Sequence, residues 1–199
     1  MRILFLGGNL VFELAEWLKD QGDDVVYTEQ KVDLIIVKEH KPDIIISYNY
    51  RYLLPPEIIE YPGYGCINLH VSLLPWNRGA YPNVWSFLED TPKGVTIHYI
   101  DEGIDTGNII IQKEVFLDEN KETLKSSYEV LHREIQVLFK ENWYKIKNNE
   151  LNSSPQVGRG SIHFKKEFVI FESFLWKGWD TPVWQFKEEY NKCRLKAQA

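Results

Sequence analysis

The N-terminal part of the chain alternates short apolar runs with amphipathic segments, and this alternation limits the fold more than any other feature. Apolar runs occupy residues 2–6, 25–28 and 43–47. Such short continuous runs are typical of strands buried on both faces of a parallel sheet. The segments between them carry apolar residues at helical spacing, and Asn9 is a candidate N-cap for the first helix. The repeated pattern predicts a doubly wound α/β fold.

The later part of the chain adds strands, one long helix and an aromatic-rich end. Residues 94–100 and 108–115 alternate with period two, which predicts an antiparallel pair or a strand that returns beside the sheet. Residues 122–147 have apolar positions at steps of three and four, which predicts a long amphipathic helix. We expect a catalytic domain over residues 1–150 and a short C-terminal extension over residues 151–199.

The charge and cysteine content exclude several classes of protein. The chain has 23 basic and 29 acidic residues and a net charge of −6, whereas nucleic-acid-binding proteins usually carry a basic surface. We therefore expect no nucleic-acid partner, although one or two arginines could hold a small anion. Cys66 and Cys193 show no disulfide or zinc-site spacing. The apolar N-terminal run is too short for a signal or membrane segment, so we expect a cytoplasmic protein without a membrane partner.

Three polar residues are the first candidates for chemistry. Asn68 and His70 are two apart in a strand pattern, so their side chains share one face, and Asp105 follows in a glycine-containing loop. An amide, an imidazole and a carboxylate can polarise a carbonyl and move a proton. A hydrogen-bonded core is an equally good explanation of the strand pair, and Asp101 or Glu102 could replace Asp105. Two candidate ligands without a spacing motif are weak evidence for a metal site, and none is expected.

Two sequence blocks resemble the signatures of the folate-dependent formyltransferases. The first block is Asn-Leu-His at residues 68–70, followed by Ser-Leu-Leu-Pro at 72–75 and Arg-Gly at 78–79. The second is Asp-Glu-Gly-Ile-Asp-Thr-Gly at 101–107. The resemblance is close over residues 66–115 and only general before them. It implies a Rossmann-like, mostly parallel sheet with helices on both faces, and transfer of formyl from the co-substrate 10-formyltetrahydrofolate to an amine.

The resemblance also implies roles for the three polar residues. Asn68 and protonated His70 would donate hydrogen bonds to the oxyanion that forms when the amine attacks. Asp105 would orient His70 and stabilise its charge. The sequence leaves open which group takes the amine proton.

The donor would lie near the end of the strand at 43–47 and near the second signature, because open α/β sheets bind ligands at the carboxyl ends of their strands. The candidate donor-binding residues are Tyr48, Tyr50, Arg51, Leu53 and Asp101. A partly exposed aromatic loop without a ligand explains the tyrosines equally well.

The acceptor amine distinguishes three branches of the family. The net charge disfavours the tRNA-directed branch. The turn at residues 7–12 is too apolar for the ribose phosphate that purine-pathway enzymes bind. The segment that contains Arg78, Tyr81 and Trp85 is most similar to enzymes that formylate nucleotide-linked amino sugars, with a 4-amino-4,6-dideoxyhexose as the expected acceptor. A phosphoribosylglycinamide-type enzyme, another small-amine formyltransferase and a non-catalytic folate-binding module are the alternatives.

Many aromatic side chains occur in the C-terminal segment. These residues are too numerous for a free tail, and they either cover the sheet or form a subunit interface: Phe164, Phe168, Phe171, Phe174, Trp176, Trp179, Trp184 and Phe186. We expect a homodimer. Residues 22–42 are shorter than is usual for the family, so contacts made there are the least well predicted.

Overall fold

The computed structural model describes residues 1–8 and 11–198, and its chain forms two compact units. The first unit contains Met1–His70, Thr96–Ile111 and Gln136–Gln156, and the second contains Val71–Val95, Gln112–Ile135 and Val157–Ala199. The units therefore interleave along the sequence. The division into domains near residue 150 stays a prediction.

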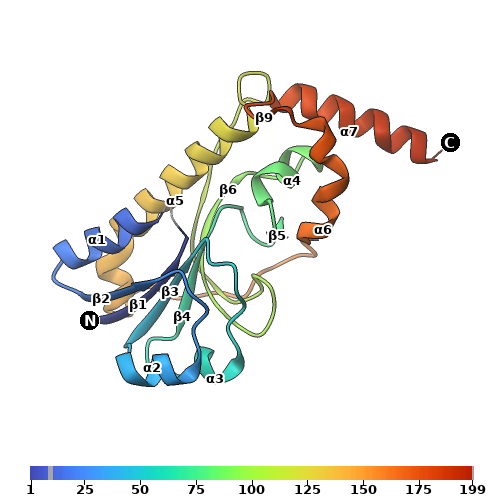
Figure 1. Ribbon diagram of the computed structural model, residues 1–199. Coiled ribbons are helices and arrows are strands. Elements are labelled where there is room, and N and C mark those ends of the chain that lie inside the picture. The colour runs from blue at the N-terminus through green and yellow to red at the C-terminus, as the bar shows by residue number, and fades with distance from the viewer. Residues whose placement is uncertain (9–10, 199) are drawn as a thin grey trace. The chain divides into compact units, whose positions relative to one another are not determined.

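A six-stranded sheet has the order β2-β1-β3-β4-β6-β7 (Figure 1). Its strands are β1 (Arg2–Gly7), β2 (Asp24–Thr28), β3 (Ile44–Tyr48), β4 (Cys66–His70), β6 (Gly94–Tyr99) and β7 (Ile109–Glu114). The first four strands pair in parallel, and β6 pairs antiparallel with β4. This arrangement confirms the expected α/β sheet, and β6 is the strand that returns beside it.

Helices of the first unit cover both faces of its strands (Figure 1). They are α1 (Phe12–Asp20), α2 (Leu34–His40), α3 (Pro56–Ile59) and the C-terminal half of α5 (Leu124–Lys147). On one face, Leu4, Leu6 and Ile45 pack in a buried cluster with residues of α2 and α3. On the other, the rings of Trp17 in α1 and Phe139 in α5 contact each other with centroids 6.3 Å apart. Two-sided burial explains why the strands are continuously apolar.

Local sequence signals set the ends of helix α2. The Asp33 side chain accepts a hydrogen bond from the Ile36 amide at 2.9 Å, as an N-cap does. Lys41 adopts the left-handed conformation at φ 49°, and Pro42 follows it. The predicted cap of the preceding helix, Asn9, lies outside the described residues.

The second unit contains short elements and most of the aromatic residues. Its elements, besides the N-terminal half of α5, are β5 (Arg78–Gly79), α4 (Pro82–Leu88), β8 (Ile162–His163), α6 (Lys165–Phe168), a 3-10 helix η1 (Val169–Phe174), β9 (Trp176–Trp179) and α7 (Val183–Gln198). Strands β5 and β8 pair in parallel. Phe168, Phe171 and Phe186 are buried in this unit. Four other aromatic side chains remain 43–58% exposed: Phe164, Trp176, Trp179 and Trp184.

Two further findings bear on the sequence-based expectations. No helix among residues 1–8 and 11–198 has the length and apolar character needed to cross a membrane. Cys66 is a buried free thiol and Cys193 is an exposed one.

Candidate active site

Strands β4 and β6 bring four polar side chains to one face of the sheet. In their antiparallel register, Asn68 lies opposite His98 and His70 lies opposite Thr96. Alternate residues of a strand point to the same side, so each strand contributes two of the four. His70, His98 and Thr96 are buried. The predicted pairing of Asn68 and His70 on one face is therefore joined by a second histidine.

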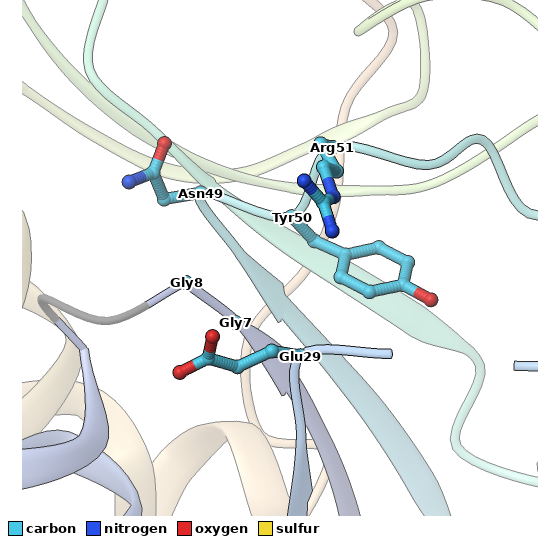
Figure 2. Close-up of a pocket in the computed structure, with 6 residues that line it drawn as sticks. All are labelled: Gly7, Gly8, Glu29, Asn49, Tyr50 and Arg51. Carbon is cyan, nitrogen blue, oxygen red and sulfur yellow. The ribbon is translucent and has the colours of Figure 1, made fainter. Parts of the chain in front are cut away.

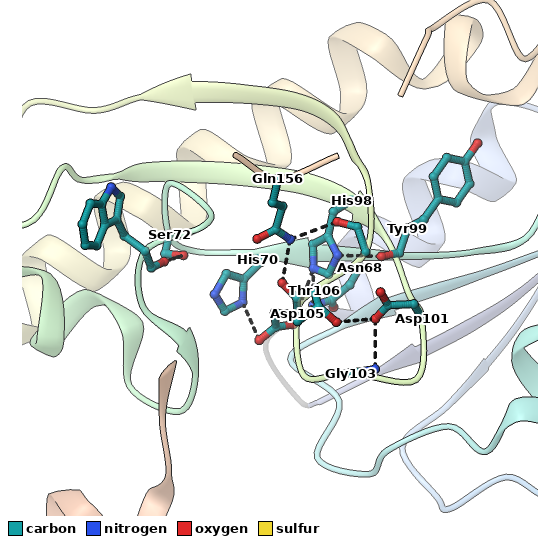
Figure 3. Close-up of polar contacts among 12 residues, drawn as sticks. Asn68, His70, Ser72, His98, Tyr99, Asp101, Gly103, Asp105, Thr106 and Gln156 are labelled. Carbon is teal, nitrogen blue, oxygen red and sulfur yellow. Dashed lines mark hydrogen bonds and ion pairs between the residues drawn. The ribbon is translucent and has the colours of Figure 1, made fainter. Parts of the chain in front are cut away.

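The loop over residues 101–107 carries the carboxylate of the site. The Asp101 side chain accepts hydrogen bonds from the Gly103 amide at 3.0 Å and the Thr106 hydroxyl at 2.6 Å, so it stabilises the loop from inside. Asp105 has a left-handed backbone with φ 52°. This conformation is uncommon outside glycine, but aspartate tolerates it better than most residues. It turns the Asp105 side chain toward β4 (Figure 3).

Asp105 lies at the centre of the polar cluster (Figure 3). Its Oδ1 accepts a hydrogen bond from Asn68 Nδ2 at 3.1 Å and is 3.5 Å from His98 Nε2. Its Oδ2 is 3.6 Å from His70 Nδ1. The last distance is longer than a hydrogen bond. One carboxylate thus faces two imidazoles and one amide.

The hydrogen bonds of His98 determine how the Asn68 amide is used. His98 Nδ1 is 2.7 Å from the Tyr99 carbonyl, so in a neutral ring Nδ1 carries the proton and Nε2 is an acceptor. Nε2 lies 3.3 Å from Asn68 Nδ2. The two hydrogens of that amide can therefore be shared between His98 and Asp105. A substrate oxygen would have to take the place of one of these partners.

The cluster has the groups needed for acyl transfer without a covalent enzyme intermediate. It offers hydrogen-bond donors for a developing oxyanion and a carboxylate that can stabilise a charged imidazole. Only 15% of the Asp105 side chain is exposed, and partial burial strengthens electrostatic interactions. Ser72 is occupied locally, because its hydroxyl donates to the Trp76 carbonyl at 2.7 Å.

A small recess with a volume of about 160 Å³ lies at the carboxyl ends of β1, β2 and β3 (Figure 2). It is lined by Gly7, Gly8, Glu29, Asn49, Tyr50 and Arg51. Two of the predicted donor-binding residues, Tyr50 and Arg51, thus line it. Tyr48 is buried at the end of β3, whereas the Leu53 side chain is 74% exposed. The recess is the place where an open parallel sheet usually binds a ligand.

Tyr50 links the recess to the preceding loop. Its hydroxyl accepts a hydrogen bond from the Val32 amide at 3.0 Å and donates to the Gln30 carbonyl at 2.8 Å. Burial raises the pKa of Tyr50 above its ordinary value, which keeps this hydroxyl protonated. The Arg51 guanidinium lies 5.0 Å from the centre of the Tyr52 ring. The tyrosines are therefore partly structural, and Arg51 supplies a cation.

The predicted acceptor-binding residues lie in the second unit. Arg78 begins β5, and Tyr81 precedes α4 with a left-handed φ of 54°. The Tyr81 ring contacts Phe168 with centroids 4.3 Å apart. Trp85 is buried and stacks on His163 at a centroid distance of 4.0 Å. The C-terminal segment thus supports the acceptor-binding candidates within this unit.

His98 in the polar cluster and Gln156 beside the 101–107 loop were not among the predicted site residues. His98 has a visible signal, because it occupies the same face of a period-two strand as Thr96. Gln156, whose side chain contacts the 101–107 loop, follows a polar segment that indicates only a linker. Among the described residues, no three His, Cys, Asp or Glu side chains gather in a way that would hold a metal ion.

Comparison with known proteins identifies relatives of this chain. The model of the formyl transferase family matches residues 21–141. The crystal structure of the formyltransferase PseJ from Anoxybacillus kamchatkensis, in complex with UDP-4,6-dideoxy-4-formamido-L-AltNAc and tetrahydrofolate, is 46% identical with a TM-score of 0.86. The match covers 92% of this chain and 96% of that one. A 4-N formyltransferase from Francisella tularensis is 25% identical with a TM-score of 0.75, over 85% of this chain and 78% of its own.

Curated relatives have a different acceptor in their names. A methionyl-tRNA formyltransferase from Clostridioides difficile (strain 630) is 34% identical over 176 residues. The match covers 74% of this chain and 57% of that enzyme. A second such enzyme, from Thermodesulfovibrio yellowstonii, is 40% identical over 125 residues, which are 61% of this chain and 40% of the relative. The chain thus spans about half the length of the curated relatives that it matches.

Proposed function

Because this chain belongs to the formyl transferase family, we propose that it transfers a formyl group from 10-formyltetrahydrofolate to the amine of a nucleotide-linked amino sugar. A 4-amino-4,6-dideoxyhexose is the proposed sugar. The product would serve the synthesis of surface polysaccharides, and we expect the reaction to occur in the cytoplasm.

The convergence of Asn68, His70 and Asp105 carries the proposal. These residues come from a strand and a distant loop, and the Asp105 carboxylate lies 3.1 Å from Asn68 Nδ2 and 3.6 Å from His70 Nδ1. Both signature blocks contribute to the cluster. A fold module that only binds folate would have no need for an amide, an imidazole and a carboxylate around one point, so the cluster favours an enzyme over the non-catalytic alternative.

The side chains of Asn68, His70 and Asp105 would each have a separate role in the transfer. The amine nitrogen forms a bond to the formyl carbon and loses a proton, while the bond to the departing folate nitrogen breaks and that nitrogen gains one. Asn68 and His70 would donate to the oxyanion of the tetrahedral species. Nδ1 of His70 faces Asp105 (Figure 3), so Nε2 would be the atom of this ring that donates to the oxyanion. Asp105 would hold the ring in this orientation and stabilise its positive charge.

The donor would bind beside β3 and the 101–107 loop. The recess provides an aromatic ring from Tyr50 and a cation from Arg51, which suit a planar and anionic ligand. Leu53 adds an exposed apolar side chain, while Tyr48 is buried and would contribute through its backbone. Asp101 would act through the loop that it stabilises. The co-substrate supplies the formyl carbon and the leaving nitrogen.

The similarity to the A. kamchatkensis structure supports a sugar acceptor, since that protein holds a UDP-linked 4-formamido sugar. Arg78 could pair with the diphosphate, because a guanidinium binds phosphate oxygens in a bidentate manner. Tyr81 and Trp85 provide aromatic surface for a base or a deoxysugar. Both rings also pack on the C-terminal segment, so binding and local stability depend on the same residues.

Methionyl-tRNA is the second candidate acceptor, and the identity to the C. difficile enzyme favours it. A tRNA is a polyanion whose binding usually requires a basic surface. The net charge of −6 disfavours that acceptor. The two candidate acceptors can be tested in the same formyl-transfer assay, which shows directly which of them is formylated.

The assay incubates the protein with 10-formyltetrahydrofolate and, in parallel, UDP- and dTDP-linked 4-amino-4,6-dideoxyhexoses, phosphoribosylglycinamide and methionyl-tRNA. Mass spectrometry detects the acceptor in which a formyl group has replaced an amine hydrogen. We expect product only with a nucleotide sugar. We expect Asn68→Ala to lower kcat by about 10²–10³-fold, as the loss of an oxyanion donor does in other acyl-transfer enzymes.

Asp101→Asn is a second variant in this assay, since it alters the loop but leaves the side chains of Asn68, His70 and Asp105 unchanged. Its kcat should fall less than that of Asn68→Ala. Product with methionyl-tRNA alone would replace the sugar acceptor. Tight tetrahydrofolate binding without turnover of any amine would identify a binding module. Full activity of Asn68→Ala would disprove the proposed mechanism.

A further inference from the structure

Gln156 contacts the loop of Asp105 from a distant part of the chain (Figure 3). Its Nε2 donates to the Asp105 carbonyl at 2.7 Å and to the Gly107 carbonyl at 2.9 Å. A primary amide nitrogen has two hydrogens, so both are used on carbonyls two residues apart. The side chain thus closes across the part of the loop that contains the left-handed residue.

The neighbouring backbone fixes where Gln156 can reach. Ile109 and Ser154 form an antiparallel bridge, in which the Ile109 amide donates to the Ser154 carbonyl at 2.8 Å and the reverse bond measures 2.9 Å. This bridge anchors the segment after α5 beside the start of β7. Gln156 is two residues beyond the bridge, so its backbone is held close to the loop that its side chain contacts.

The loop itself needs such support. A left-handed backbone at a residue other than glycine costs about 1–2 kcal/mol, so Asp105 keeps its φ of 52° only where other contacts favour it. Gly107 approaches the main chain closely on the other side, because a Cβ there would lie 1.9 Å from the Tyr99 carbonyl oxygen. Gly107 therefore packs directly against the end of β6. Gln156 binds the carbonyls of Asp105 and Gly107 in the same part of the loop.

We propose that Gln156 is a positioning residue for formyl transfer, which holds the Asp105 carboxylate at the distances from Asn68 and His70 that the reaction needs. This inference rests on the proposed function of the cluster. Gln156 acts through the backbone of Asp105 and touches neither reactant. A small displacement of a catalytic group is costly, since a misplacement of about 1 Å can lower the rate by about 10²-fold. Its loss should therefore affect kcat more than substrate binding.

Gln156→Met tests the proposal, because methionine has a similar length but no hydrogen to donate. Gln112→Met is the matched control. The Gln112 side chain also donates from Nε2 to a backbone carbonyl, that of Leu74, at the same 2.7 Å, but this contact is in the second unit. We expect Gln156→Met to lower kcat by about 10–100-fold with KM values for donor and acceptor within about threefold of wild type. Gln112→Met should keep the wild-type kcat.

A double-mutant cycle separates positioning from general destabilisation. Once Asp105→Asn has removed the carboxylate, its exact position should matter little, so adding Gln156→Met should lower kcat by less than about threefold. Gln156→Glu, which cannot donate to the carbonyls and whose carboxylate would be repelled by them, should lower kcat at least as much as Gln156→Met. Undiminished kcat in Gln156→Met, or a full additional loss in the Asp105→Asn background, would overturn the proposal.

Hydrogen exchange measured by mass spectrometry gives a readout that needs no turnover. Amides of residues 101–108 should exchange at least about tenfold faster in Gln156→Met than in wild type, while Gln112→Met leaves them unchanged. Inactivity of the wild-type protein with every acceptor would refute the proposed function. The exchange data would still show whether Gln156 stabilises the 101–107 loop. Unchanged exchange in Gln156→Met would refute the inference even if the wild type is active.

Discussion

In the proposed reaction the Asn68 amide has two tasks, since it binds neighbouring side chains and would also donate a hydrogen bond to the substrate. Its two Nδ2 hydrogens lie within reach of Asp105 and His98, at 3.1 and 3.3 Å. Asn68 is half-buried, and leaving its amide without partners would be costly, so these contacts stabilise the protein. If the formyl oxygen replaces one of them, the donor is already oriented when charge develops. His98 therefore helps to orient the side-chain amide of Asn68.

Replacement of His98 tests this division. We expect His98→Leu to lower the free energy of unfolding by about 1–3 kcal/mol, because it leaves the Tyr99 carbonyl without its partner. We also expect kcat to fall by about tenfold or more, because an oxyanion donor that is wrongly oriented loses part of its effect. Urea denaturation and steady-state kinetics measure the two effects.

His40→Leu is the control for this prediction, since His40 lies in the last turn of α2 and outside the polar cluster. It should change neither quantity appreciably. A His98→Leu protein with wild-type kcat would show that the orientation of Asn68 does not depend on His98.

At the scale of elements, a buried carboxylate ties helix α5 to the segment before β2. The Asp23 side chain is only 1% exposed. It accepts a hydrogen bond from Trp143 Nε1 at 2.7 Å, and Lys147 Nζ is 3.4 Å away. Trp143 and Lys147 are both in the C-terminal half of α5, and the Met1 ammonium, 3.1 Å from Asp23 Oδ1, is a third partner. The C-terminal half of α5 is thus held in the first unit by a polar contact as well as by its apolar face. The helical pattern of apolar residues predicts the apolar face but not the polar contact.

The contribution of Asp23 can be measured against its neighbour in the sequence. Asp23→Ala should destabilise the protein by about 3–5 kcal/mol, because it leaves the Trp143 donor and the cations of Lys147 and Met1 without their partner. Asp24 is exposed at the start of β2, and Asp24→Ala should change stability by less than about 0.5 kcal/mol. Urea unfolding gives both values. Equal effects of the two substitutions would contradict the role assigned to the Asp23 contact.

At the scale of the whole molecule, the two compact units are continuous through shared elements, since β6, β7 and α5 each contribute residues to both. The second unit keeps Trp176, Trp179 and Trp184 substantially exposed. Exposed aromatic side chains are enriched where proteins bind one another. These residues support the expectation of a homodimer, which stays a prediction.

Size-exclusion chromatography coupled to light scattering tests the prediction of a homodimer at micromolar protein concentration. We expect a mass of twice the 23.5 kDa chain. The double variant Trp176→Lys, Trp179→Lys should shift the protein to the mass of one chain, because charged groups oppose an apolar interface. Phe116→Lys, at a side chain that is 90% exposed outside the C-terminal segment, should not. A monomeric wild-type protein would disprove the prediction.

Features that depend on local pattern could be predicted from the order of residues alone. Short apolar runs predicted the strands, helical spacing predicted α1 and α5, and period two placed Asn68 and His70 on one face. The two signature blocks also led to the family. These features depend on backbone geometry that repeats every two or 3.6 residues, and a single sequence reports such periods directly.

The distant residues that complete the cluster could not be predicted in this way, because folding brings them together. His98 lies beside Asn68 because of the register between β4 and β6, and register depends on pairing across the sheet. Gln156 reaches the loop of Asp105 through the bridge between Ile109 and Ser154. Contacts of this kind connect residues far apart in the chain and have no period. They become visible only when the chain has closed the intervening loops and packed its strands.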